Sequence, residues 1–190
     1  MPDLHLSPLA PVTALGAQTA RLLRLDRLTL AEVPDLGLAS LALRRGTQAP
    51  APFGLTLPTA GNCARHGAIS AFWTGPDQWM IEGAGAAGRD FAAEVAAEAP
   101  GCSVTEETDG FAAFDVTSHW GEGPILCLLS RIANIDPARL APGMAVRTGL
   151  DHMSVFVVRR SAEQVTVLGM RSAAGSLWHT LQAITTRVTA

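Results

Sequence analysis

The sequence predicts an α+β fold made of two interlocked ferredoxin-like halves, in which two strands and then a helix repeat along the chain. Three observations lead to this prediction. Strand-like runs outnumber helical runs, short turn sequences join many of the strands in pairs, and the regular strand–helix alternation of a doubly wound fold is missing. We therefore expect mostly antiparallel sheets, each covered by helices on one face.

Length and composition fit one domain of this kind. The chain has 190 residues, of which 48% are hydrophobic and 16% are charged, a balance typical of a folded core. We predict an N-terminal arm over residues 1–26 and a single domain over residues 27–190. The pseudo-repeated halves of that domain are expected at about residues 27–100 and 101–190.

In the first half, the patterns predict two strand pairs and two helices. A short helix is expected over residues 14–25 and a second, alanine-rich helix over 89–98, ended by Pro100 and Gly101. The predicted strand pairs cover residues 27–33 with 38–45, and 68–73 with 79–83.

The second half repeats this order. Strands over residues 102–108 and 111–118 are expected to form a hairpin through Asp109-Gly110, which is a strong short-range hairpin signal. A helix over about 124–132 follows, and then three strands and an amphipathic C-terminal helix are expected. Their ranges are 144–150, 154–160, 164–170 and 172–188.

A glycine motif lies between the strand and the helix in the first half. Gly83, Gly85 and Gly88 have the G-x-G-x-x-G spacing of dinucleotide-binding loops, and Glu106 lies about 20 residues further on. We interpret the motif as a turn, because a dinucleotide site requires a parallel crossover and hairpins are predicted on both sides. Glu82 would also bring negative charge close to a pyrophosphate. Dinucleotide binding at Gly83–Gly88 stays an alternative.

Residues suited to catalysis are few. Asp115 and His119 are four positions apart and could form an acid–base pair, although Asp115 is better interpreted as capping the turn after its strand. Trp73 and Trp79 flank a turn and could stack across a hairpin, with a ligand-binding aromatic box as the alternative. We predict no catalytic, cofactor-binding or metal-binding residue in this chain.

The remaining candidates for chemistry also lack the required spacing. The cysteines contain no C-x-x-C pair, which predicts free thiols in place of disulfides or a zinc site. These are Cys63, Cys102 and Cys127. The histidines have no metal-binding spacing. These are His5, His66, His119, His152 and His179.

Charge and hydropathy bear on partners and location. The net charge is −3 and both signs are interspersed, which predicts no nucleic-acid partner. The first 20 residues lack a basic region before their apolar part, and no apolar run reaches about 18 residues. We therefore predict a cytoplasmic protein with no membrane partner.

Four segments, in order and in register, resemble the gamma subunit of heterotetrameric sarcosine oxidase. They are FWTGPDQWMI (72–81), FAAFDVTSHW (111–120), IDPARLAPGMAVRTGL (135–150) and MRSAAGSLWHTLQ (170–182). That family is similar to the folate-binding domain of aminomethyltransferases, the T-proteins of glycine cleavage, which implies a folate-binding-domain-like fold here. The aminomethyltransferases continue with G-G-I-x-D-D, whose carboxylate faces the folate. This chain has LDHMSVFV at that place, with Asp151 as the nearby acid.

The resemblance implies a function within a complex. Such oxidases demethylate sarcosine to glycine, with formaldehyde or methylene-tetrahydrofolate and hydrogen peroxide as further products. FAD, FMN, NAD and tetrahydrofolate are implied in the partner subunits, and none in this chain. The implied partners are the alpha and beta subunits, with a delta subunit as a further one. The resemblance leaves open a second interpretation, an independent folate-dependent aminomethyltransferase-like protein.

Overall fold

The computed structural model describes residues 12–132 and 135–189. Three α-helices occur within these residues, at α1 (Phe91–Glu98), α2 (Gly123–Ile132) and α3 (Ala174–Thr189). The strands are β1 (Leu22–Arg24), β2 (Leu28–Glu32), β3 (Leu36–Leu43), β4 (Cys63–His66), β5 (Ile69–Gly75), β6 (Gln78–Ala84), β7 (Cys102–Glu106), β8 (Phe111–Ser118), β9 (Ala145–Leu150), β10 (Met153–Arg159) and β11 (Gln164–Met170). Short 3-10 turns lie at Pro52–Gly54, Pro137–Arg139 and Arg171–Ala173.

The strands form two antiparallel sheets. The six-stranded sheet has the order β1-β2-β8-β11-β10-β9, and the five-stranded sheet has the order β4-β5-β6-β3-β7. Each sheet takes strands from both halves of the sequence, because β2 pairs with β8 and β3 pairs with β7. The predicted α+β class with interlocked halves is confirmed. The chain changes sheets between β2 and β3 and again between β7 and β8.

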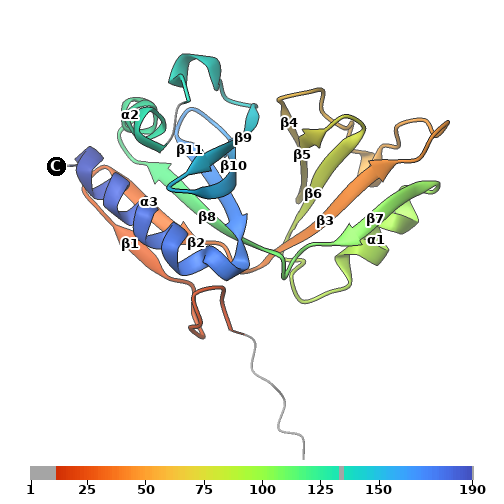
Figure 1. Cartoon of the computed structure of the whole chain (residues 1–190), viewed down its shortest axis with the longest axis horizontal. Helices are drawn as coiled ribbons and strands as arrows, with labels where there is room; N and C mark the ends of the chain where they lie inside the picture. The colour runs from red at the N-terminus through yellow and green to blue at the C-terminus, as the bar shows by residue number, and fades with distance from the viewer. Residues whose placement is uncertain (1–11, 133–134, 190) are drawn as a thin grey trace, which may run out of the picture.

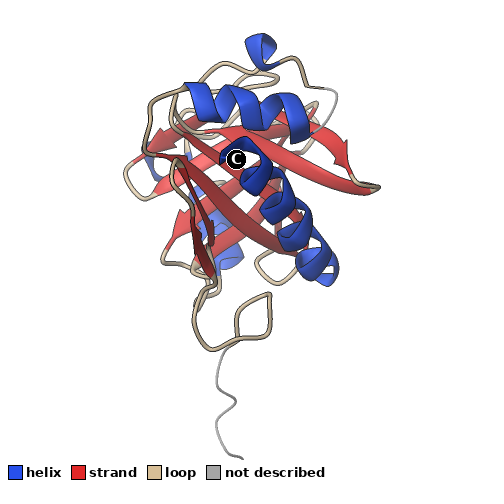
Figure 2. Cartoon of the chain, turned by 90° about the vertical axis from the view of Figure 1, so that its left-hand side faces the viewer, coloured by secondary structure: helices blue, strands red, loops and turns tan. Residues whose placement is uncertain are grey.

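The sheets lie side by side with their helices on the outside (Figure 1). The helices α2 and α3 pack on the outer face of the six-stranded sheet (Figure 2), and α1 packs on the five-stranded sheet. Successive side chains of a strand point to opposite faces of its sheet, so one strand contributes both to the core beneath the helices and to the layer between the sheets. On β8, Phe114 and Val116 lie in the core beneath the helices, whereas Phe111 and Ala113 pack toward the other sheet.

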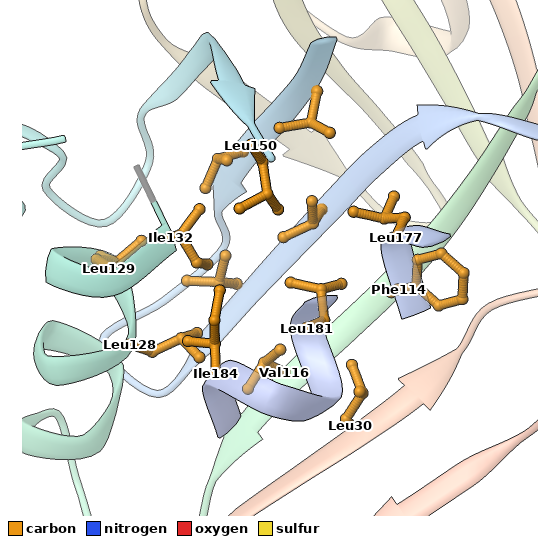
Figure 3. Packing of buried hydrophobic residues seen from close by; sticks show 14 of the residues in the cluster. Leu30, Phe114, Val116, Leu128, Leu129, Ile132, Leu150, Leu177, Leu181 and Ile184 are labelled. Atoms are coloured by element: carbon orange, nitrogen blue, oxygen red, sulfur yellow. The ribbon is translucent and has the colours of Figure 1, made fainter. Parts of the chain in front are cut away.

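The largest core lies between the six-stranded sheet and its two helices. Leu181 and Ile184 of α3 meet Leu128 of α2 above Val116 of β8 (Figure 3). The apolar face predicted for α2 is fully or almost fully buried. Burial of large aliphatic side chains stabilises a fold by about 1.5–3 kcal/mol each, so this cluster fixes both helices on the sheet.

Two predicted strand pairings are wrong. β2 and β3 lie in different sheets, and so do β7 and β8, so the Asp109-Gly110 turn connects the sheets instead of closing a hairpin. β3 already has β6 and β7 on its two edges, and β8 has β2 and β11, so neither strand has a free edge for its neighbour in sequence. The predicted β5–β6 and β10–β11 pairs are confirmed.

The helix predicted over residues 14–25 is also wrong. This segment is irregular and then forms β1 at the edge of the six-stranded sheet. The buried carboxylate of Glu32 accepts hydrogen bonds from the backbone amides of Leu15 (3.0 Å) and Arg21 (3.1 Å). These amides are therefore bound by a side chain from β2 and not by a helix of their own.

Candidate functional site

A cavity of about 490 Å³ opens between the two sheets. Its volume lies within the range of small-molecule pockets. Val33, Leu36 and Ala84 form part of an apolar side, and polar side chains from β5, β8 and β11 form the other. We call this space the inter-sheet cavity. Its polar lining includes Ser70, Asp115, Arg160, Gln164 and Thr166.

A buried ion pair joins the two sheets beside this cavity. Glu82 of β6 is 0% exposed, and both of its carboxylate oxygens accept hydrogen bonds from the Arg160 guanidinium, at 2.6 and 2.7 Å. The Ser70 hydroxyl donates a further bond to Glu82, at 2.6 Å. Burial alone would lower the pKa of Arg160, but the adjacent carboxylate outweighs that effect and raises it. Arg160 therefore stays charged, as this bidentate geometry requires.

Asp115 extends the network along the six-stranded sheet. Its carboxyl group accepts hydrogen bonds from Thr166 Oγ1 (2.6 Å) and Gln164 Nε2 (2.9 Å), and Arg160 Nε donates to the same Thr166 hydroxyl (2.9 Å). Burial raises the pKa of Asp115, although these hydrogen bonds and the charge of Arg160 counteract the effect. Burial therefore makes Asp115 easier to protonate than an exposed aspartate.

Cys63 is the one thiol that lines the inter-sheet cavity. Burial raises the pKa of this thiol above its usual value, despite the nearby charge of Arg160. Burial thus favours the protonated thiol, which is the less nucleophilic form. All three cysteines are free, as predicted.

The glycine motif lies in the connection from β6 through α1 to β7. Both strands pair antiparallel with β3, so they run parallel to each other with β3 between them. The predicted reason against a dinucleotide loop, the lack of a parallel crossover, is therefore wrong. The glycines nevertheless serve packing and turning: a Cβ on Gly83 would lie 2.6 Å from the Phe91 ring, and Gly85 has a φ of +72°.

Carboxylates already cap the first turn of α1. Asp90 accepts a hydrogen bond from the amide of Ala93, and Glu106 accepts one from the amide of Ala92, both at 3.0 Å. Burial would raise the pKa of Glu106, but hydrogen bonds from the Thr108 side chain and backbone amides outweigh it and lower the pKa. A phosphate at this helix terminus would displace or approach two negative groups, which disfavours the dinucleotide alternative.

Solved structures share this fold, although the sequence matches no family model and no curated protein. One is the heterotetrameric sarcosine oxidase from Corynebacterium sp. U-96 in complex with pyrrole 2-carboxylate. A chain of it matches with a TM-score of 0.71 and 18% identity, over 86% of this chain and 86% of that chain. Another is the glycine cleavage system aminomethyltransferase T from Bartonella henselae, with a TM-score of 0.57 and 12% identity, over 79% of this chain and 44% of that chain.

This chain has the fold of both proteins. The resemblance found in the four sequence segments is therefore confirmed at the level of the fold. The chain spans less than half the length of the aminomethyltransferase, but it spans most of the oxidase chain.

Asp151, the acid near the place of the G-G-I-x-D-D stretch, does not line the inter-sheet cavity. Asp151 and His152 form the two-residue turn between β9 and β10, both with positive φ (45° and 67°). The Asp151 carboxylate is exposed and accepts a hydrogen bond from the Thr180 hydroxyl of α3 (3.2 Å). Its observed role is to join this turn to the C-terminal helix.

Asp115 and His119, which the sequence left open as an acid–base pair, bond to different partners. Asp115 lies within β8, so it does not cap a turn as predicted, and it points toward the inter-sheet cavity. His119 lies beyond the strand and bonds through Nε2 to the Thr29 hydroxyl, at 2.7 Å. The Asp115 carboxyl group and the His119 ring therefore belong to two separate hydrogen-bond networks.

The other histidines give no metal site. Within residues 12–132 and 135–189, no three or more His, Cys, Asp or Glu side chains are arranged to hold a metal ion. His66 bonds to the carbonyl oxygen of Phe53 (3.0 Å). His5 lies outside the described residues.

The two tryptophans of the β5–β6 hairpin serve the core. Trp73 and Trp79 are direct cross-strand partners in the predicted hairpin. Both pack in the cluster beneath α1, and the Trp79 indole donates a hydrogen bond to the carbonyl oxygen of Pro58 (2.7 Å). This hydrogen bond and burial favour a structural role over an aromatic ligand box.

Within the described ranges, none of the helices combines the length and the apolar character needed to cross a membrane.

Proposed function

We propose that this chain is the gamma subunit of a heterotetrameric sarcosine-oxidase-like complex and that its role there is structural. The observation that carries the proposal is the match to one chain of such an oxidase over 86% of both chains. Equal coverage means that the two chains have about the same length and that most of each corresponds to the other. The four resembling sequence segments support the same assignment.

In this proposal the complex oxidises sarcosine to glycine in the cytoplasm, giving formaldehyde or methylene-tetrahydrofolate and hydrogen peroxide. FAD, FMN, NAD and tetrahydrofolate bind to the partner subunits. A non-catalytic role agrees with the inter-sheet cavity, because Arg160 in its lining is held by Glu82 and Thr166, and Asp115 is held by Thr166 and Gln164. Groups held in such a network are costly to rearrange and poorly available to a substrate.

Co-expression tests this assignment. The chain, tagged and produced with the alpha and beta subunits of the complex, is expected to purify with them in a fixed ratio and to yield a yellow complex that oxidises sarcosine. The chain alone is expected to be colourless and inactive. Sarcosine oxidation by the isolated chain, or its failure to purify with the larger subunits, would contradict the proposal.

The second candidate is an independent folate-dependent aminomethyltransferase-like protein. The volume of the inter-sheet cavity favours it, together with the fold shared with aminomethyltransferase T. Titration of the isolated chain with tetrahydrofolate, followed by calorimetry, distinguishes the candidates. Saturable binding in the micromolar range would support a folate protein, and no heat of binding is expected for a structural subunit.

A further inference from the structure

An exposed tryptophan and an arginine form a stacked pair at one end of the six-stranded sheet. Trp120, just after β8, is 64% exposed, and the Arg27 guanidinium lies 5.3 Å from its ring centroid. A tryptophan this exposed is unusual on a protein surface that only water covers. Tryptophan and arginine are also among the residues most enriched at the centres of protein interfaces.

Two hollows open at this end of the sheet, and the pair lines only the smaller one. The larger, of about 440 Å³, is lined by Leu22 and Leu25 and by the hydrogen-bonded Thr29 and His119. The smaller, of about 250 Å³, lies between Trp120 and the chain at Pro124, Cys127 and Val188. We call Leu22, Arg24, Leu25, Arg27 and Trp120, with these hollows, the Trp120 surface.

The larger hollow lies on a sheet face that is covered elsewhere. Leu22, Ala31 and Asp115 are neighbours in one row across β1, β2 and β8. The Asp115 end of the row is covered by the five-stranded sheet and its ion pair, whereas Leu22, on the edge strand β1, is 50% exposed. In Figure 1, β1 and β2 lie on the side of the molecule away from the five-stranded sheet. Nothing in the described part of the chain therefore covers this end of the row.

Charge indicates what kind of surface would bind there. Residues 21–27 (RLLRLDR) contain three arginines and one aspartate, a net charge of +2. The whole chain carries −3, so the remaining residues carry −3 − 2 = −5. A small basic and apolar region on an acidic chain favours a partner that offers acidic groups around an apolar side chain.

We infer that the Trp120 surface docks this chain onto one of the larger subunits of its complex, at an acidic surface with a protruding apolar residue. This inference rests on the proposed function. The hollow beside Trp120 accepts the apolar residue, and Arg24, in the larger hollow, faces the acidic groups at the rim. Arg27 stacks on Trp120 and pairs with Asp26 (3.6 Å). Truncation of Trp120 removes the centre of the contact, while a change at Arg24 alters its charge.

Three variants of the full chain test the inference, with binding to the purified alpha–beta subunits measured by surface plasmon resonance. Trp120→Ala is expected to weaken binding at least about 30-fold, the size typical of a central interface residue. Arg24→Glu is expected to slow association and to reduce the dependence of affinity on salt. Met170→Ala is the matched control, because Met170 is 52% exposed and lies at the opposite end of the β8–β11 pair. Its affinity is expected to equal that of the unchanged chain.

The outcomes separate the inference from the proposed function. If the unchanged chain binds and Trp120→Ala binds equally well, the inferred docking surface is wrong, but the proposed membership of the complex is supported. If the unchanged chain does not bind the larger subunits at all, both are wrong. If Trp120→Ala instead abolishes self-association in sedimentation velocity, the partner is a second copy of this chain and the inferred occupant is wrong. Unchanged thermal midpoints confirm that the variants are folded.

Discussion

Two consecutive arginines at the end of β10 are neutralised in opposite ways. Arg159 points toward α2 and is 2% exposed, and it pairs with Glu122, which is 46% exposed. Arg160 points between the sheets and is 20% exposed, whereas its partner Glu82 is 0% exposed. One pair thus buries the cation and leaves the anion near water, and the other pair does the reverse.

The burial of each partner decides what remains when the other is removed. Without Arg159, the half-exposed Glu122 remains in contact with water, whereas without Arg160 the buried Glu82 carboxylate keeps only the hydrogen bond from Ser70. Strand alternation creates a similar contrast on β6, where Glu82 points between the sheets and Gly83 faces Phe91 of α1. Between the sheets, a charge pair therefore lies beside an apolar cluster that includes Phe72, Met80 and Val158, whereas Gly83 on the other face of β6 lies in a layer that is packed by apolar side chains alone.

The largest effect is expected from Arg160→Met. It leaves the Glu82 carboxylate buried without its cation, which typically destabilises a fold by about 3–5 kcal/mol. The free energy of unfolding in urea measures the change. The exposed Arg65, which lines the same cavity, gives the control Arg65→Met, for which about 0.5 kcal/mol or less is expected.

The double variant Glu82→Met with Arg160→Met sharpens this test. If the cost of Arg160→Met comes from the unpaired carboxylate, the double variant is more stable than the single one, because no buried charge remains. A double variant that is less stable than Arg160→Met would show that side-chain packing, and not charge pairing, dominates this layer.

Gly83→Ala tests the helix-covered side of β6. The new Cβ would lie 2.6 Å from the Phe91 ring and 2.9 Å from the Ala86 Cβ, and such overpacking costs about 1–3 kcal/mol. Gly88→Ala is the matched control within the same motif, because no heavy atom lies within 4 Å of its added Cβ. Its stability is expected to change by about 0.5 kcal/mol or less.

The same pair of variants bears on the dinucleotide alternative. A glycine loop used only for packing gives no rise in the thermal midpoint when NAD is added to the unchanged chain. A concentration-dependent rise that Gly88→Ala abolishes would contradict the packing interpretation.

Arg159→Met is expected to cost less than Arg160→Met. It removes the hydrogen bond to the carbonyl oxygen of Leu140 (2.7 Å) and the ion pair with Glu122, but Glu122 can then be hydrated. Loss of charged hydrogen bonds of this kind costs about 1.5–3 kcal/mol. Urea unfolding of both methionine variants gives the comparison directly, and equal losses would remove the distinction between the two pairs.

Local patterns predicted the elements better than their partners. The apolar spacing of α2 and α3 and the strands from 144 to 170 are confirmed, because a single helix or strand reveals its buried face in its own sequence. The Asp109-Gly110 turn led to a wrong strand pairing, because a turn sequence predicts that the chain bends and not that the two strands beside it pair. Which edges remain free for β7 and β8 depends on strands far away in the chain.

The inter-sheet network was harder to predict. Glu82 and Arg160 are 78 positions apart, and the sequence singled out only Glu82, as a negative charge beside the glycines. A signal was nevertheless available, because Glu82 interrupts an apolar strand on the face opposite Ile81, where a lone charge requires a buried partner. Arg160 could be identified as that partner only from the way in which the two sheets pack against each other.

The smallest expected effect is a pH dependence of stability. It tests whether the charge of Asp115 affects stability as the charges of the neighbouring Glu82–Arg160 pair do. Burial raises the pKa of Asp115 above its ordinary value of 3.8. The folded chain therefore holds this proton over a pH range in which the unfolded chain has released it. The resulting stabilisation is complete below pH 3.8 and is lost as the pH rises through the raised pKa.

Asp115→Asn removes this titration, so its free energy of unfolding is expected to improve relative to the unchanged chain as the pH rises from about 3 to about 7. Thr166→Val gives the complementary test. It removes a hydrogen bond that lowers the pKa of Asp115, so the loss of stability is expected at higher pH than in the unchanged chain. A difference between Asp115→Asn and the unchanged chain that stays constant with pH would mean that hydrogen bonding, and not burial, governs this carboxyl group. The contribution of charge to stability between the sheets would then come from the Glu82–Arg160 pair and not from Asp115.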